Sequence, residues 1–188
     1  MFSTNTGRRM RKSAGMALGF ITVLFAGAVA LAGPASAATV TAQLDSGRIL
    51  VNGSSVDDGI EITLNLAGTV VTISNTLGSV AAGSGCTQSG GEAKCPAGGI
   101  DRVDVFAGDG IDSIRNNTNL PGTLSGDNGI DTVNGGSGAD ILFGGFGDDT
   151  LNGNGGNDRL IGSIGHDRLN GGADTDRCDG EVETNCEL

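Results

Sequence analysis

One hydrophobic position recurs at a fixed interval through the C-terminal part of the chain. Residues 126–179 consist of six nine-residue copies without an insertion. Glycine holds the first slot of every copy and, except in the last copy, the fourth. The eighth slot holds, in order, Val133, Leu142, Leu151, Leu160, Leu169 and Cys178. Self-similarity at a short fixed period is typical of solenoid proteins, in which each repeat stacks on its neighbours.

The slot pattern predicts a coil of short strands and glycine-rich turns. Six turn residues followed by three strand residues form half a coil, so two copies, or eighteen residues, complete one circuit. The slot-eight side chain points inward and stacks in a thin column, with strands on one wall about 4.8 Å apart. The glycines permit the positive φ angles that tight turns need. We therefore expect an all-β, parallel solenoid.

A weaker copy precedes the regular ones. In residues 107–115, Asp112 takes the sixth slot and Ile114 the eighth, but Asp131 follows Asp112 after nineteen residues instead of eighteen. The segment 116–124 between them contains a Pro-Gly turn and no aspartate. We interpret residues 99–125 as degenerate repeats, with one rung that keeps the coil and loses the ligand.

Residues 38–98 have no nine-residue register, but part of this segment alternates. Every second residue from Ile60 to Leu66 is isoleucine or leucine, and residues 68–74 are rich in β-branched side chains. Both patterns are typical of short strands. We expect an irregular β cap that continues the coil at its N-terminal end. A separate small β-sandwich is the alternative.

Residues 1–37 have the organisation of a secretory signal peptide. A basic segment, 8–12, is followed by an apolar run, 16–33, and by small residues at 35–37. This order predicts cleavage before Ala38 and release of the protein to the extracellular space. A retained membrane anchor is the alternative, because the apolar run is nearly long enough to span a bilayer. The choice between general and twin-arginine export stays open.

The charge of the chain favours cations as partners. Cleavage would remove four of the 11 basic residues and none of the 22 acidic ones, so the net charge would fall from −11 to −15. This sign disfavours nucleic acid and anionic membrane surfaces. The whole chain contains 35 glycines, and only three aromatic residues follow position 37. Such a composition usually indicates disorder, so something beyond ordinary side-chain burial must hold the fold.

The four cysteines, all located after the predicted cleavage site, are Cys86, Cys95, Cys178 and Cys186. In an exported protein they are expected to form disulfides, and four cysteines allow three pairings. We expect the local pairing, with Cys86–Cys95 in the cap and Cys178–Cys186 tying down the C-terminal tail, residues 180–188. A zinc site is not expected, because the spacings match no common zinc pattern and the chain has a single histidine.

The sixth slots supply the candidate metal ligands. They are Asp112, Asp131, Asp140, Asp149, Asp158, Asp167 and Asp176. Turns eighteen residues apart are neighbours, so these carboxylates form two facing ladders that repel unless a cation lies between their members. Carboxylates and the backbone carbonyls of the glycine turns are hard oxygen ligands, which suit Ca²⁺ better than Mg²⁺. We expect about four complete Ca²⁺ sites.

The phrase Gly-Gly-x-Gly-x-Asp-x-Leu-x, which occurs twice in residues 134–151, resembles the RTX, or hemolysin-type, calcium-binding repeat. The resemblance covers 126–179 well and 99–125 loosely. It implies a right-handed parallel β-roll that binds Ca²⁺ between adjacent turns, with the sixth-slot aspartates as ligands. The ending TDRCDGEVETNC is similar to that of small secreted bacterial proteins built from these repeats.

Two slots depart from the family pattern. The second slot, often glycine in the family, holds Asp127, Asn154 and Ser163 in three copies. The fourth slot of the last copy is Asp174, so coordination in the last turn can differ.

No enzymatic motif accompanies the repeats. The metalloprotease pattern HExxH is absent, and His166, the only histidine, sits in a solvent-facing fifth slot. We interpret the chain as a non-enzymatic calcium-binding protein that folds on binding Ca²⁺. Two alternatives stay open. One is a calcium-dependent adhesin or matrix component that binds polysaccharide or a surface protein. The other is a degenerate hydrolase or epimerase module with its site in residues 39–125.

Overall fold

The structure, a computed structural model, describes residues 39–187. In this range the chain forms seventeen β-strands and no helix. The predicted signal peptide, residues 1–37, lies outside the described residues. Within residues 39–187 there is no helix that could cross a bilayer.

Seven strands precede the repeats. They are β1 (Val40–Asp45), β2 (Arg48–Ser54), β3 (Gly59–Leu64), β4 (Val70–Asn75), β5 (Val80–Ala82), β6 (Thr87–Ser89) and β7 (Glu92–Pro96). Ten strands follow in the repeat part of the chain. They are β8 (Arg102–Asp109), β9 (Ser113–Asn117), β10 (Gly122–Asn128), β11 (Thr132–Asn134), β12 (Ile141–Phe146), β13 (Thr150–Gly155), β14 (Arg159–Ile164), β15 (Arg168–Ala173), β16 (Arg177–Asp179) and β17 (Val182–Thr184).

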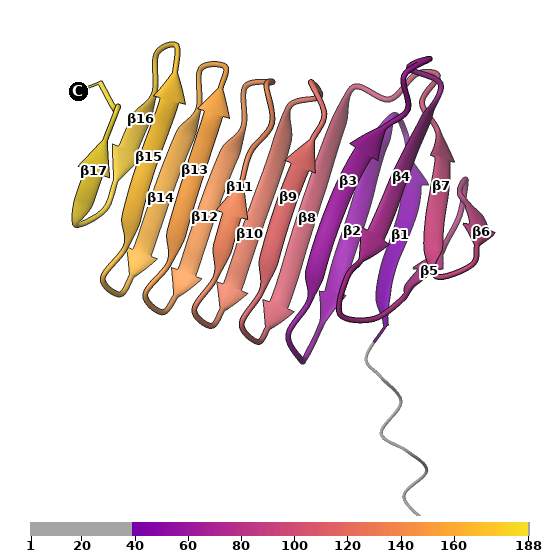
Figure 1. Ribbon diagram of the computed structural model, residues 1–188, viewed down its shortest axis with the longest axis horizontal. Coiled ribbons are helices and arrows are strands. Elements are labelled where there is room, and N and C mark those ends of the chain that lie inside the picture. The colour runs from indigo at the N-terminus through magenta and orange to yellow at the C-terminus, as the bar shows by residue number, and fades with distance from the viewer. Residues whose placement is uncertain (1–38, 188) are drawn as a thin grey trace, which may run out of the picture. The chain divides into compact units, whose positions relative to one another are not determined.

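The strands form two sheets, which are the two walls of a solenoid (Figure 1). One sheet has the order β16-β14-β12-β10-β8-β2-β1-β5, and the other has the order β17-β15-β13-β11-β9-β3-β4-β7-β6. From β8 onward the chain alternates between the walls, and strands on one wall pair in parallel. Paired residues of the regular copies are eighteen apart, as in Leu142↔Leu160 and Leu151↔Leu169. The fold is therefore the all-β parallel β-roll that the sequence predicts.

A thin column of hydrophobic side chains fills the space between the walls. Five slot-eight residues have relative exposures of 0% or 1%, namely Val133, Leu142, Leu151, Leu160 and Leu169. The degenerate repeats continue this column with Ile114 and Leu124, both fully buried. The inward orientation predicted for slot eight is confirmed.

The strands are longer than the slot pattern predicts. We expected three strand residues in each copy, but β12, β13, β14 and β15 contain six each. The ladder continues through the first three slots of the next copy, as in Gly145↔Ser163 and Phe146↔Ile164. It continues because the backbone donors and acceptors of successive turns stay in register whether or not a side chain is present. In these copies only slots four to six form the turn, whereas β11 and β16 have the three residues expected.

The second slot has a left-handed backbone conformation in five of the six copies. Its φ angles are 116° at Gly145, 106° at Gly172, 71° at Asp127, 73° at Asn154 and 83° at Ser163. Aspartate and asparagine adopt this region more readily than most other L-residues. The departures from glycine noted in the sequence are therefore compatible with an unbroken coil.

The degenerate rung keeps its place in the wall. Thr123 pairs with Ile141, so Gly122 stands where a regular copy has its sixth-slot aspartate. The preceding turn is closed by Asn116, whose Oδ1 accepts hydrogen bonds from the Thr118 hydroxyl at 2.7 Å and the Thr118 N–H at 3.2 Å. An amide and a hydroxyl thus shape this turn in place of a carboxylate.

Residues 39–98 add strands to the same two walls. β2 pairs in parallel with β8, and β3 pairs in parallel with β9. Within this segment β1–β2 and β3–β4 are antiparallel. Ile60 and Ile62 of β3 are buried, as their alternation predicts, whereas Leu66 lies beyond the end of the strand and is fully exposed. The hydrophobic core is continuous from this segment into the repeats.

Both local disulfides predicted from the sequence are present. Cys86 is bonded to Cys95 on β7, and Cys178 on β16 is bonded to Cys186 in the tail. The second bond therefore fastens the tail to the last turn of the roll.

Because the column is one residue wide, each leucine in it is expected to matter strongly. Replacing Leu151 with alanine truncates a side chain that is fully buried. We expect the free energy of unfolding to fall by about 2–5 kcal/mol. Thr150→Ala, on the outer face of the same strand, is the matched control, with an expected change of about 0.5 kcal/mol or less. Urea denaturation in saturating Ca²⁺ measures both, and equal losses would contradict a single-column core.

Candidate metal centres

The sixth-slot aspartates lie where each turn ends and the next strand begins. Asp149 directly precedes β13, and Asp158 directly precedes β14. The seven candidate ligands all have relative exposures of 0–3%: Asp112, Asp131, Asp140, Asp149, Asp158, Asp167 and Asp176. A buried carboxylate is costly unless hydrogen bonds or an opposite charge compensate it.

Four of these aspartates stack on one edge of the roll, which we call the four-aspartate rim: Asp112, Asp131, Asp149 and Asp167. The N–H of Asp112 donates to Asp131 Oδ1 at 2.7 Å, and the N–H of Asp131 donates to Asp149 Oδ1 at 2.8 Å. The N–H of Asp149 donates to Asp167 Oδ1 at 2.9 Å. Each carboxylate is therefore bound through one oxygen to the backbone of the preceding turn.

The other three stack on the opposite edge, the three-aspartate rim: Asp140, Asp158 and Asp176. The N–H groups of Asp140 and Asp158 donate to the Oδ1 atoms of Asp158 and Asp176, both at 2.8 Å. Asp140, the first of this ladder, instead accepts from Gly136 N–H through Oδ2 at 2.7 Å. The two rims share one bonding scheme.

One oxygen of every rim carboxylate has no hydrogen-bond donor. The unpartnered buried atoms are Asp112 Oδ2, Asp131 Oδ2, Asp140 Oδ1, Asp149 Oδ2, Asp158 Oδ2, Asp167 Oδ2 and Asp176 Oδ2. Asp104, on an outer wall, provides the contrast. It is also buried, but it pairs with Arg48 at 3.2 Å and Arg102 at 2.7 Å. The rim carboxylates lack the cationic partner that the chain gives to Asp104.

The first-slot glycines leave space beside these oxygens. A methyl group placed on Gly144 would lie 2.7 Å from the carbonyl oxygen of Gly162 and would also meet Asp149 Oδ2. A methyl group on Gly153 would likewise meet the Gly171 carbonyl and Asp158 Oδ2. A side chain in slot one would therefore fill the gap between a backbone carbonyl and a carboxylate of the roll. This requirement accounts for glycine in the first slot of every copy.

These donor atoms fit a hard divalent cation. Each gap brings together carboxylate and carbonyl oxygens, which are the ligands that Ca²⁺ prefers. Among residues 39–187 no three His, Cys, Asp or Glu side chains converge on a point, so backbone oxygens must complete any coordination shell. Thiolate and imidazole ligands, which zinc favours, do not contribute here, because all four cysteines are in disulfides and His166 is exposed on a turn.

Burial shifts the proton affinity of the rims. Desolvation raises the pKa of Asp112 and Asp158 to about 7 and that of Asp131 and Asp140 to about 6, from an ordinary value of 3.8. It also raises the pKa of Asp149. Backbone N–H donors oppose these shifts. On the four-aspartate rim the next carboxylate of the ladder adds to them. Without a cation, protons are the only charge compensation available at these oxygens.

The four-aspartate ladder begins with a carboxylate that the repeat pattern does not identify. Asp58 N–H donates to Asp112 Oδ1 at 2.7 Å, so Asp58 occupies the place of a preceding repeat. Its own oxygens are satisfied by the backbone N–H and hydroxyl of Ser54 and by the side-chain amide of Asn75. Residues 59–98, which separate Asp58 from the degenerate repeats, form cap strands, so periodicity could not reveal this role.

The ladders end on two glutamates, which the sequence analysis also missed. Glu181 accepts a hydrogen bond from Asp167 N–H at 2.9 Å, and Glu187 accepts one from Asp176 N–H. Both lie in the tail, where the nine-residue register has ended. The acidic composition of the tail was the available signal, but its spacing gave no role to any one residue.

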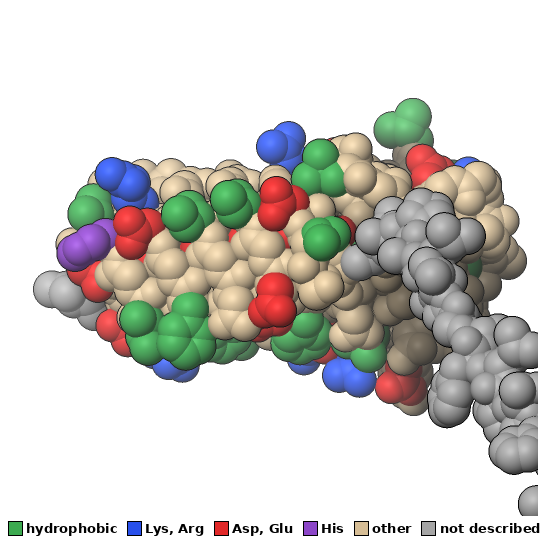
Figure 2. Space-filling view, turned by 90° about the horizontal axis from the view of Figure 1, so that it is seen from below, with side chains coloured by type: hydrophobic (Ala, Val, Ile, Leu, Met, Phe, Trp, Pro, Cys, Tyr) green, Lys and Arg blue, Asp and Glu red, His purple; other side chains and the backbone are tan. Residues whose placement is uncertain are grey.

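The exposed residues described next are not among the candidate ligands. His166 is exposed, and its backbone N–H donates to Asp148 Oδ1 at 2.9 Å. Hydrophobic and acidic side chains follow one another along the edge shown in Figure 2. The exposed hydrophobic residues of the described chain include Ile111, Ile130 and Phe146, with exposures of 55–60%.

One surface hollow has a volume of about 670 Å³. Its lining comes from residues 64–66, 116–119 and 135–137, together with Asn154. These residues offer amides, hydroxyls and backbone groups and include no acidic or basic side chain.

The raised pKa values predict how the calcium-free fold responds to pH. The folded chain binds protons at these carboxyls more tightly than the unfolded chain, whose ordinary pKa is 3.8. Their contribution to stability is therefore present at low pH and is lost as pH rises through about 6–7. In EDTA, we expect a stronger β-sheet signal in circular dichroism at pH 5 than at pH 8. A signal that grows from pH 5 to pH 8 would contradict this sign.

Comparison with known proteins agrees with the geometry of the rims. The family model described as the RTX calcium-binding nonapeptide repeat, which comprises four copies, matches residues 122–151 and again residues 152–183. Searches of curated proteins and of solved structures gave no significant match. The matched residues include every strand from β10 to β16 and six of the seven candidate ligands. Residues 122–183 of this chain are therefore RTX calcium-binding nonapeptide repeats.

Proposed function

We propose that the protein is a secreted calcium-ion-binding protein whose β-roll forms around Ca²⁺ held between the aspartates of successive turns. One observation carries the proposal: seven buried carboxylates each keep one oxygen without a donor. Neighbouring first-slot glycines keep the space beside these oxygens open. The N-terminal sequence expected to direct export supports the extracellular location, where Ca²⁺ is abundant.

The ligands of each site would come from two neighbouring turns. Ca²⁺ would supply positive charge and accept hard oxygen donors, and the chain's own contribution is to place those donors in advance. On the four-aspartate rim the neighbouring pairs are Asp112 with Asp131, Asp131 with Asp149, and Asp149 with Asp167. On the three-aspartate rim they are Asp140 with Asp158, and Asp158 with Asp176. The pair made by Asp112 adds one to the four sites expected from the sequence, because it has the same N–H to Oδ1 bond as the others.

The same features make folding depend on the ion. Glycine-rich segments lose much conformational entropy on folding, and this roll offers only a thin column of buried side chains in return. Burying seven carboxylates adds a further cost. Ion binding to the folded state alone offsets these costs, so binding and folding are coupled. Affinities of about 10⁻⁴–10⁻³ M, as in other extracellular calcium modules, would suit such a role.

Calcium removal tests the coupling directly. At pH 8, we expect EDTA to abolish most of the β-sheet signal in far-ultraviolet circular dichroism and excess Ca²⁺ to restore it. Mg²⁺ at the same concentration should restore much less, because it demands a rigid octahedral shell and gives up its waters reluctantly. Identical spectra in EDTA and in Ca²⁺ would exclude folding on the ion.

A matched pair of variants tests the ligand assignment. Asp149→Asn removes the charge of a buried ligand shared by two sites, whereas Asp148→Asn removes the same charge from the exposed neighbouring residue. We expect Asp149→Asn to lower the number of bound ions and to raise the Ca²⁺ concentration needed for folding by about tenfold or more, as loss of a charged ligand costs at least about 1.4 kcal/mol. Asp148→Asn should titrate like the unaltered protein. Isothermal titration calorimetry distinguishes them, and equal stoichiometry for both would remove Asp149 from the ligand set.

A further inference from the structure

The C-terminal tail takes the place of the turn that another repeat would supply. In the regular copies the N–H of the slot-seven residue donates to the backbone carbonyl of the sixth-slot aspartate one full turn earlier on the same rim. Arg177 N–H, for example, donates to the Asp158 carbonyl at 2.9 Å. In the tail, Glu187 N–H donates to the Asp176 carbonyl at 2.7 Å. The Glu187 carboxylate also accepts the N–H of Asp176, as Asp176 accepts that of Asp158. The tail thus reproduces both backbone bonds of a regular turn.

The tail also reproduces the carbonyl of a regular turn. A methyl group placed on Gly153 would meet the Gly171 carbonyl oxygen and Asp158 Oδ2. A methyl group placed on Gly171 would meet the Asn185 carbonyl oxygen and, at 2.5 Å, Asp176 Oδ2. Asn185 therefore presents its carbonyl where the next first-slot glycine would present one.

The two ends of the roll differ in the groups that close them. At the N-terminal end, Asp58 is surrounded by donors from Ser54 and Asn75, so both of its oxygens are satisfied. At the C-terminal end, Asp176 Oδ2 is fully buried and has no donor, and the tail brings another carboxylate and a carbonyl toward it. A buried acceptor that has no donor is costly unless an opposite charge compensates it, and a cation shared by these oxygens would do so.

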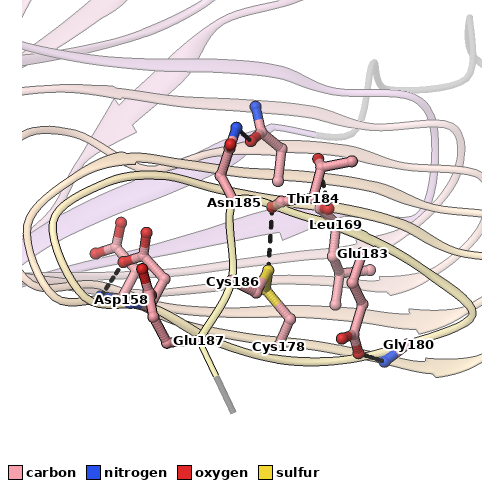
Figure 3. Close-up of a disulfide and its surroundings, with 11 residues drawn as sticks. Asp158, Leu169, Cys178, Gly180, Glu183, Thr184, Asn185, Cys186 and Glu187 are labelled. Atoms are coloured by element: carbon pink, nitrogen blue, oxygen red, sulfur yellow. Dashed lines mark hydrogen bonds between the residues drawn. A yellow bond between two sulfur atoms is a disulfide. The ribbon is translucent and has the colours of Figure 1, made fainter.

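Two bonds hold the tail in this position. The disulfide joins Cys186, which lies between Asn185 and Glu187, to Cys178 on β16. The side-chain amide of Asn185 donates to Asn170 Oδ1 at 2.7 Å. Figure 3 shows the disulfide, Asn185 and Glu187 together on this last turn.

From these contacts we propose that the tail completes a further calcium site on the three-aspartate rim. Its ligands are Asp176 Oδ2, the Asn185 carbonyl and the Glu187 carboxylate, and the Cys178–Cys186 disulfide positions the last two. The site rests on the proposed calcium binding of the repeats and extends it beyond the matched residues 122–183. Its formation depends on disulfide oxidation, which is complete only outside the reducing cytosol.

Two variants of the full chain test the site by equilibrium dialysis against Ca²⁺. Glu187→Gln keeps an oxygen that can accept Asp176 N–H and removes only the charge. Cys178→Ser combined with Cys186→Ser releases the tail. We expect each variant to bind one ion fewer than the unaltered protein, with the remaining ions bound at unchanged affinity. Glu183→Gln is the control, because Glu183 lies in the same tail, is exposed and bonds only to Gly180 N–H among the tail contacts.

The outcomes separate this proposal from the proposed function. If the unaltered protein binds no Ca²⁺, calcium binding by the repeats fails first. If it binds Ca²⁺ and Glu187→Gln binds the same number of ions, the terminal site is wrong and the repeat sites stand. A loss seen only in the cysteine variant would also overturn the site, since Glu187 would then not be a ligand. Circular dichroism in saturating Ca²⁺ confirms that each variant retains the roll.

Discussion

The bond between a buried aspartate and the peptide of the preceding turn organises this protein. It uses one carboxylate oxygen and leaves the other oxygen buried without a hydrogen-bond donor. Except at Asp140, where the ladder starts with a bond from Gly136 N–H of the same copy, the bond runs to the neighbouring turn, so a turn depends on its neighbour to hold its carboxylate. Each turn therefore depends on the next one, and the negative charge accumulates along both rims as the roll lengthens. Glycine in slot one follows from this one arrangement, and so does the cation that we propose between the turns.

The hydrophobic column cannot carry the fold without help. A typical core residue contacts several others from several directions, whereas here each leucine meets mainly the residues above and below it and those on the facing wall. The strands supply backbone hydrogen bonds, but such bonds largely replace bonds to water. The rims must therefore contribute to the stability of the fold as well as to its shape. A carboxylate ladder without a compensating charge would lower that stability.

The sequence predicts the repeats well because a strict register leaves few choices. Nine residues with one inward leucine and one aspartate determine the pairing of neighbours eighteen apart, the buried column and the two rims. Strand length was misjudged because glycine was assigned wholly to turns, although Gly144 and Gly145 belong to β12. The local disulfides could be predicted from export and short spacing. The ends of the ladders could not, because Asp58, Glu181 and Glu187 act through contacts outside the register.

The two ends of the roll also differ in what they need from the environment. The N-terminal strands bury isoleucine and valine residues from β1 to β5, and Asp58 is compensated by protein groups alone. That part of the chain has less need of a cation, and through β2 and β3 it presents two strand edges on which β8 and β9 pair in parallel. Apart from the degenerate turn closed by Asn116 and Thr118, each turn from Asp112 to Asp176 adds a buried carboxylate with one oxygen that has no donor. If folding is coupled to Ca²⁺ as we propose, dependence on the ion would increase along the chain, and the cap would serve as the template on which the roll assembles toward its acidic tail.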